Sequence, residues 1–206
     1  MSSFRKFLVI ALVITAFAGG TVFMVLAVQG PRGMPQHATI LPQPAPLSLF
    51  SLRDQSGAEF NNQSLSGQWS LIFFGFTHCP DICPATLQQL AVARRRVLDE
   101  GAGIFPNIIL ISVDPERDSP EVLAEYTGHF GAGVMGVSGS LDELRKLTSS
   151  LGIYFQKSGT ENENYSVDHS AVVIVINKNA ELHALFSAPH AINKFVEDIP
   201  LIMEST

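Results

Sequence analysis

The chain has 206 residues, which is enough for one compact domain with an appendage and too few for two large domains. Hydrophobic residues make up 46% of it and charged residues 16%, which argues against an intrinsically disordered protein. The formal net charge is -6 and the basic run at residues 94–96 reads as a solvated helix face, so we expect no nucleic-acid partner.

The N-terminal region contains a long apolar segment. Residues 7–28 carry no charged side chain, and about 20 apolar residues in a helix cross the hydrocarbon core of a bilayer. Arg5 and Lys6 precede the segment, which favours a cytoplasmic position for residues 1–6. We therefore predict a single-pass anchor in the inner (cytoplasmic) membrane, with the remainder of the chain on the periplasmic, outer side. The alternative is a cleaved signal peptide, because residues 16–18 (Ala-Phe-Ala) resemble a cleavage site.

Residues 29–46 are rich in proline and glycine, a composition that is incompatible with a helix. We interpret this segment as an extended tether between the predicted anchor and a folded domain that spans residues 47–206.

Strand and helix patterns alternate along the predicted domain. A short hairpin is expected within residues 48–60, and helical spacing of apolar residues follows the two cysteines, up to residue 98. The other strands are expected at residues 70–76, 108–113, 134–137, 171–176 and 182–186, and the other helices at residues 120–130, 141–151 and 191–203. Such alternation predicts an α/β fold with parallel crossovers, a mixed sheet and helices on both faces. Two cysteines at the first strand-to-helix junction are typical of the thioredoxin-like plan.

Cys79 and Cys83 are the two cysteines of the chain. If a helix begins near Asp81 or Ile82, residues four apart lie on one face of a turn, so both sulfurs can reach one ion. The helix N-terminus is also expected to favour thiolates. A disulfide between these residues would close a very short loop and stabilise little. The spacing alone does not distinguish among three interpretations: a metal site, a redox-active dithiol and a structural disulfide.

A metal site built on two thiolates needs a further ligand, and His169 is the candidate. It stands immediately before the apolar strand at 171–176, and the loop entering that strand lies beside the cysteine-bearing helix in a thioredoxin-like sheet. Two thiolates and one imidazole favour copper, with zinc as the second choice. The neighbouring Asp168 is either a group that orients this site or an ordinary loop acid. The other five histidines are assigned to the tether (His37), a side chain turned away from Cys79 (His78), a helix C-terminus (His129) and the surface (His183 and His190).

A polar segment, residues 114–118, follows the second strong strand. Asp118 or Ser119 is expected to cap the next helix, and Arg117 to pair with a neighbouring carboxylate. A surface for a partner protein is the functional alternative.

Three motifs together resemble the Sco/SenC family. They are residues 74–84 (Phe-Gly-Phe-Thr-His-Cys-Pro-Asp-Ile-Cys-Pro), residues 112–118 (Ser-Val-Asp-Pro-Glu-Arg-Asp) and residues 167–169 (Val-Asp-His). The resemblance covers residues 47–203 and implies a copper chaperone, rather than an enzyme, that delivers copper to the binuclear copper centre of cytochrome c oxidase. It implies one copper ion per chain on Cys79, Cys83 and His169, held as Cu(I), with Cu(II) left open. It also implies that the two cysteines reduce the target cysteines before copper is inserted.

The resemblance implies that the copper-bearing subunit of cytochrome c oxidase is a partner, together with other copper chaperones or thiol reductants. The alternative function is a membrane-anchored thiol–disulfide oxidoreductase that uses Cys79 and Cys83. A peroxidase, suggested only by the spacing of Thr77 and Cys79, ranks third. Because a disulfide removes both thiolates, we expect copper uptake to require the reduced protein.

Overall fold

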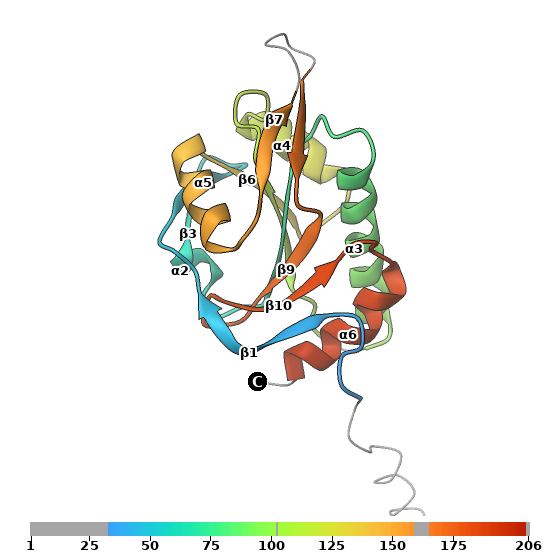
Figure 1. Cartoon of the computed structure of the whole chain (residues 1–206). Coiled ribbons are helices and arrows are strands. Elements are labelled where there is room, and N and C mark those ends of the chain that lie inside the picture. Colours follow the sequence, from blue (N-terminus) through green and yellow to red (C-terminus); the bar gives the residue numbers. More distant parts are fainter. Residues whose placement is uncertain (1–32, 102, 159–164, 205–206) are drawn as a thin grey trace, which may run out of the picture. The chain divides into compact units, whose positions relative to one another are not determined.

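The computed structural model describes residues 33–101, 103–158 and 165–204, drawn in colour in Figure 1. The predicted cytoplasmic end, residues 1–6, and the predicted membrane span, residues 7–28, lie outside this part of the chain. Within the described part, no helix combines the length and the apolar character that crossing a bilayer requires.

The described residues form an eight-stranded mixed sheet, a separate two-stranded ribbon and five helices. The large sheet has the strand order β1-β10-β9-β4-β5-β6-β2-β3, and the ribbon pairs β7 with β8. The strands are β1 (Thr39–Pro46), β2 (Ser51–Asp54), β3 (Glu59–Asn61), β4 (Ser70–Gly75), β5 (Asn107–Ser112), β6 (Val134–Ser138), β7 (Phe155–Ser158), β8 (Ser166–His169), β9 (Val172–Ile176) and β10 (Glu181–Ser187). The helices are α2 (Asn62–Leu65), α3 (Ile82–Asp99), α4 (Pro120–Gly128), α5 (Leu141–Ser150) and α6 (Ile192–Glu204).

The centre of the large sheet is parallel. Strands β4, β5 and β6 lie side by side in the same direction, and β9 joins β4 antiparallel. Because both crossovers advance the same way across the sheet, right-handed connections place α3 and α4 on one face. Helix α6 packs against α3, while α5 lies on the opposite side of the sheet in Figure 1. The predicted mixed sheet with flanking helices is confirmed.

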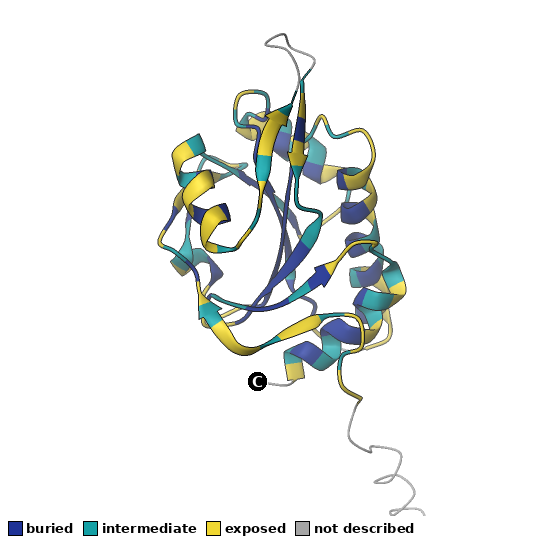
Figure 2. Cartoon of the chain, in the orientation of Figure 1, coloured by how far each residue is buried: buried dark blue, intermediate teal, exposed yellow. Residues whose placement is uncertain are grey.

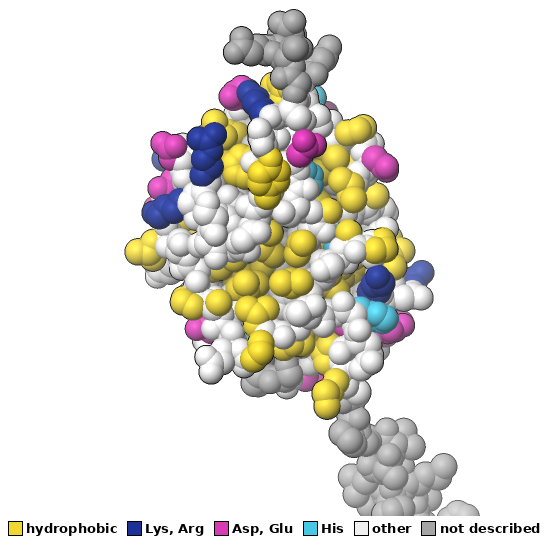
Figure 3. Space-filling view, viewed as in Figure 1, with side chains coloured by type: hydrophobic (Ala, Val, Ile, Leu, Met, Phe, Trp, Pro, Cys, Tyr) yellow, Lys and Arg dark blue, Asp and Glu magenta, His cyan; other side chains and the backbone are white. Residues whose placement is uncertain are grey.

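The hydrophobic core lies between the sheet and these helices. Every residue of β4 is buried, which explains why its sequence is a continuous apolar run rather than an alternating one. Figure 2 shows the same pattern in the neighbouring central strands and on the inward faces of the helices. On the face drawn in Figure 3, apolar side chains gather at the centre and charged groups of both signs lie around the edge.

The folded region begins earlier than the sequence suggested. Residues 39–46, assigned to the tether, form β1, which pairs with β10 at the edge of the sheet. An edge strand tolerates proline because the N–H groups on its outer side need no partner. Just before it, three backbone N–H groups donate to the carboxylate of Asp198 in α6, which is 1% exposed. The donors are Gln36 (2.9 Å), His37 (2.6 Å) and Ala38 (2.7 Å).

The expected surface position of His183 is wrong. The residue is 7% exposed, and its ring meets the ring of Trp69 edge-on with centroids 5.2 Å apart. The pairing of β10 with β9 shifts register between Leu182 and Ala184, and such an irregularity redirects the side chain that it contains. A place beside the last strand therefore does not put His183 on the surface.

Candidate metal centre

The strand-to-helix junction positions the two cysteines. Helix α3 begins at Ile82, as the sequence predicted, and its N-cap residue Asp81 makes no side-chain capping hydrogen bond. Instead, the Cys83 N–H donates to the Cys79 sulfur at 3.4 Å, so this sulfur receives one of the N–H groups left free at the helix start. Both thiols are free in the structure.

The imidazole of His169 lies beside the Cys83 sulfur and comes from a different element, strand β8. His169 is the last residue of β8, paired with Phe155 of β7, rather than part of the loop that the sequence suggested. Its imidazole lies edge-on to the rings of Phe73 (5.8 Å between centroids) and Phe76 (6.0 Å), which restrict its rotation. The Nε2 atom is 3.4 Å from the Cys83 sulfur, and the Nδ1 atom is 3.3 Å from the Ser170 carbonyl oxygen.

These contacts define one consistent arrangement of protons. If Nδ1–H donates to the Ser170 carbonyl, Nε2 carries the lone pair that faces the Cys83 sulfur. Burial lowers the pKa of His169, although Ser170 and Asp168 oppose the shift, so the imidazole is neutral near pH 7. Burial, followed by the hydrogen bond with Cys79, raises the pKa of Cys83. Burial of the Cys83 thiol thus opposes the ionisation that the helix N-terminus was expected to favour.

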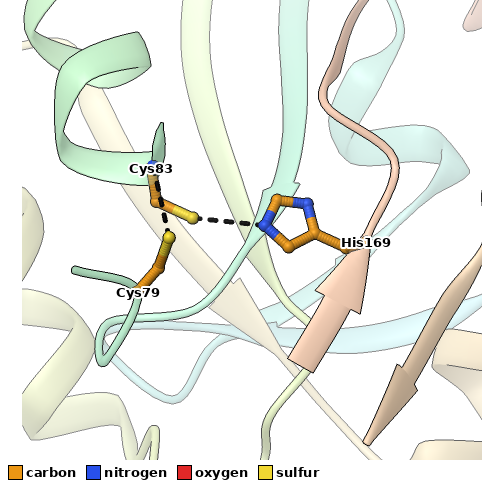
Figure 4. A group of neighbouring side chains, drawn as sticks. All are labelled: Cys79, Cys83 and His169. Carbon is orange, nitrogen blue, oxygen red and sulfur yellow. Dashed lines mark hydrogen bonds between the residues drawn. The ribbon is translucent and has the colours of Figure 1, made fainter. Parts of the chain in front are cut away.

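The three side chains fit a small, soft metal ion. Their ligand atoms, two sulfurs and one nitrogen, all lie within 4.8 Å of one another (Figure 4). A trigonal ion with bonds of about 2.3 Å to sulfur and 2.0 Å to nitrogen needs ligand atoms about 3.7–4.0 Å apart. Sub-ångström adjustments would therefore close the group around an ion, which would take the place of the proton between Cys83 and His169.

The two sulfurs differ in access. Cys83 is fully buried, whereas Cys79 and His169 line a shallow pocket of about 340 Å³. The rest of the pocket wall consists of Phe76, Pro80, Asp81, Ile82, Ser166, Val167 and Asp168. An incoming group would thus meet the sulfur of Cys79 before that of Cys83. Asp168 lines the pocket but is not one of the three clustered residues.

The other histidines do not join this cluster. The His78 ring turns toward Thr77 and Asp118, with Nδ1 3.0 Å from the Thr77 hydroxyl oxygen and 3.7 Å from the Asp118 carboxylate. His37 contacts Glu197 through Nε2 at 2.9 Å, and His129 is the exposed C-cap residue of α4. His190 is partly buried against Phe195, not on the surface as expected.

Asp118 has a role that the sequence did not indicate. Ser119 caps α4 by accepting the Val122 N–H, whereas the Asp118 carboxylate is fully buried and turned toward Thr77. It accepts hydrogen bonds from the Thr77 N–H (3.0 Å), the Thr77 hydroxyl (2.6 Å) and the Ser112 hydroxyl (2.5 Å). It therefore fixes the start of the cysteine loop. The predicted pairing of Arg117 with a carboxylate is confirmed, and its partner is Asp114.

Gly75 is a further site residue, whose role lies in having no side chain. A Cβ atom at this position would lie 2.9 Å from the Cys83 sulfur. The glycine thus provides the space that the buried thiol occupies. Its place at the end of the strand before the cysteines was the available signal, since a glycine there permits a close approach to the backbone.

The fold and the paired thiols beside an imidazole define a thioredoxin-like domain. The SCO1/SenC family model matches residues 41–204, and the chain belongs to that family. The chain is similar to the mitochondrial SCO2 homolog of Bos taurus, with 30% identity over 195 residues, covering 91% of this chain and 73% of the bovine protein.

The chain is also similar to solved structures of Sco proteins. The crystal structure of Arabidopsis thaliana ScoI with copper bound matches with a TM-score of 0.74 and 31% identity, covering 79% of this chain and 100% of that chain. The crystal structure of yeast Sco1 with copper bound matches with a TM-score of 0.72 and 31% identity, covering 79% of this chain and 91% of that chain.

Proposed function

We propose that this protein is a copper chaperone that binds one Cu(I) ion through Cys79, Cys83 and His169. The observation that carries the proposal is the cluster of two free thiols and one imidazole, whose ligand atoms lie within 4.8 Å of one another. Soft thiolates select Cu(I), and three protein ligands are fewer than a structural zinc site requires. The copper-bound relatives support the choice of metal.

The open side of the site supports transfer of the ion. The pocket exposes Cys79 and His169 while Cys83 stays buried, so a ligand of a partner protein can approach one side of the bound ion. Exchange through a shared intermediate then moves copper without releasing it to water. We propose the copper-bearing subunit of cytochrome c oxidase as the recipient, with the binuclear copper centre as the destination. We further propose that residues 7–28 anchor the chain in the inner membrane.

A Cu(I) competition titration of the reduced full-length chain, without oxygen, tests the copper site. We expect one tightly bound equivalent, and we expect His169→Ala to weaken it by at least about tenfold, since even groups that only support ligands contribute that much. His129→Ala is the matched control, because His129 is exposed at the end of α4. Unchanged affinity in His169→Ala would contradict the three-ligand site.

Delivery is tested by mixing the Cu(I)-loaded chain with the metal-free, reduced copper-bearing subunit of cytochrome c oxidase. Copper should move to that subunit, and the Cys83→Ser variant should transfer none. Copper that stays on the wild-type chain would contradict delivery.

A thiol–disulfide oxidoreductase is the second candidate, and the unequal access of the two sulfurs favours it. An accessible Cys79 can attack a partner disulfide, and the buried Cys83 can then resolve the mixed disulfide. The two functions separate in His169→Ala, which should retain disulfide reduction while losing copper affinity. The peroxidase alternative is disfavoured because the Thr77 hydroxyl is engaged by Asp118.

A further inference from the structure

One short loop contacts both segments that carry the candidate ligands. The loop, residues 114–118, connects β5 to α4. At one end, Asp118 holds Thr77, which stands two residues before Cys79. At the other end, Asp114 and Arg117 hold Tyr165, which immediately precedes β8. The sulfur side and the imidazole side of the site are thus attached to the same support.

Three side chains make four contacts with Tyr165. Its hydroxyl donates to the Asp114 carboxylate at 2.6 Å, and its carbonyl oxygen accepts from the Arg117 guanidinium at 3.1 Å. The ring centroid lies 3.7 Å from the Arg117 guanidinium carbon and 4.0 Å from the Lys157 ammonium nitrogen. Arg117 also donates to the second carboxylate oxygen of Asp114 at 2.5 Å, so both oxygens of Asp114 are engaged. Tyr165, Asp114, Arg117 and Lys157 are called the brace below.

The ribbon that carries His169 needs such a support. Strands β7 and β8 pair only with each other among the described strands, and an isolated two-stranded ribbon is marginally stable. Val167 of β8 is buried and Phe155 of β7 is partly buried against the core, and these two side chains attach the ribbon to it. Apolar contact is non-directional, so it holds the ribbon without fixing its angle. The hydrogen bonds and the stacked guanidinium at Tyr165 are directional, so they fix the angle of the ribbon.

We propose that Tyr165 is a positioning residue, which through Asp114 and Arg117 sets the distance between the His169 imidazole and the two sulfurs. Without the brace, the ribbon stays attached at Val167 and Phe155 but changes its angle to the sheet, and the imidazole leaves the position from which it can share an ion with Cys79 and Cys83. The expected effect on Cu(I) affinity rests on the proposed copper site, whereas the expected effect on the position of the ribbon does not depend on metal.

Paired substitutions in the full-length chain test the brace. Tyr165→Phe removes the hydroxyl that reaches Asp114, and Tyr165→Ala removes the ring as well. We expect Cu(I) affinity to fall about threefold in Tyr165→Phe and about tenfold in Tyr165→Ala, the sizes expected for one hydrogen bond and for an added cation–aromatic contact. Tyr154→Ala is the matched control, because Tyr154 precedes β7 of the same ribbon and is 56% exposed.

The decisive comparison places Tyr165→Ala in a His169→Ala background. If the brace acts through the imidazole, the double variant binds Cu(I) no more weakly than His169→Ala alone. An equal loss in both backgrounds, or no loss in either, overturns the proposal.

Amide hydrogen exchange of the copper-free chain gives a second readout. In Tyr165→Ala, exchange should become faster in β8 and stay at the wild-type rate in β9. In Tyr154→Ala, exchange in β8 should stay at the wild-type rate. Unchanged exchange in β8 overturns the brace even where copper affinity falls. If the wild-type chain binds no Cu(I), the proposed function fails, while the exchange data still decide whether the brace holds the ribbon.

Discussion

Gly75 offers a direct way to displace one ligand by a known distance. In Gly75→Ala the new Cβ would lie 2.9 Å from the Cys83 sulfur, 3.1 Å from the Phe73 ring and 3.3 Å from the Leu110 side chain. Ordinary contact begins at 3.4 Å, so the sulfur has to move by about half an ångström. Phe73 and Leu110 are fully buried, which leaves the added carbon little other space.

The displacement has two expected consequences. Overpacking of a dense core costs about 1–3 kcal/mol, so the free energy of unfolding should fall by that amount. Binding sites tolerate ligand displacements of only about 0.5 Å, so Cu(I) affinity should fall by about tenfold.

Gly136→Ala separates these two effects. Its Cβ would lie 2.9 Å from Leu123 in α4 and 3.3 Å from Gln55 and Thr127, a comparable collision that involves none of the three ligands. Unfolding in urea, followed by the fluorescence of the single tryptophan, Trp69, should show a similar loss of stability in both variants. Only Gly75→Ala should lose Cu(I) affinity in a competition titration. Wild-type affinity in Gly75→Ala, or an equal loss in Gly136→Ala, would refute the steric reasoning.

Two further predictions concern buried polar groups. Asp118→Asn should lower the free energy of unfolding by about 1–3 kcal/mol, because hydrogen bonds to a charged carboxylate are stronger than hydrogen bonds to a neutral amide. Urea unfolding measures this beside the exposed control Asp99→Asn, and equal stabilities would contradict it. Burial lowers the pKa of His183, with Glu181 opposing the shift, so the stability that the neutral ring contributes is complete above about pH 6.5 and is lost as the pH falls below it. The urea midpoint should therefore drop between pH 7.5 and pH 5.5 by less in His183→Leu than in the wild type, and an identical drop would show that another group is responsible.

The central strands were predictable because burial on both faces demands an unbroken apolar run. Strand β4 and its neighbours β5 and β9 satisfy that demand, and the helix start assumed near Asp81 or Ile82 agrees with α3. His169 could be assigned only through the expected fold, since nothing in its neighbouring residues distinguishes it from other histidines.

The elements that were missed have weak sequence signals for physical reasons. Strand β1 contains several prolines, and whether such a segment pairs depends on an edge that only the folded sheet provides. Strands β7 and β8 bury a single side chain between them, so no alternation marks them. The hydrogen bonds from Asp118 and Asp114 join residues 41 and 51 positions apart, and no local pattern records such contacts.

The attachment of the chain's leading segment to Asp198 has a mechanical consequence. A pull applied through Gln36 would first load the three N–H bonds to that carboxylate and then β1, which pairs with β10 near both of its ends. Strands β10 and β9 stand between β1 and β4, at whose end the cysteine loop begins. A load on Gln36 therefore enters the sheet at its β1 edge, two strands away from β4. Through Asp198 it also reaches α6, which packs against the cysteine-bearing helix α3.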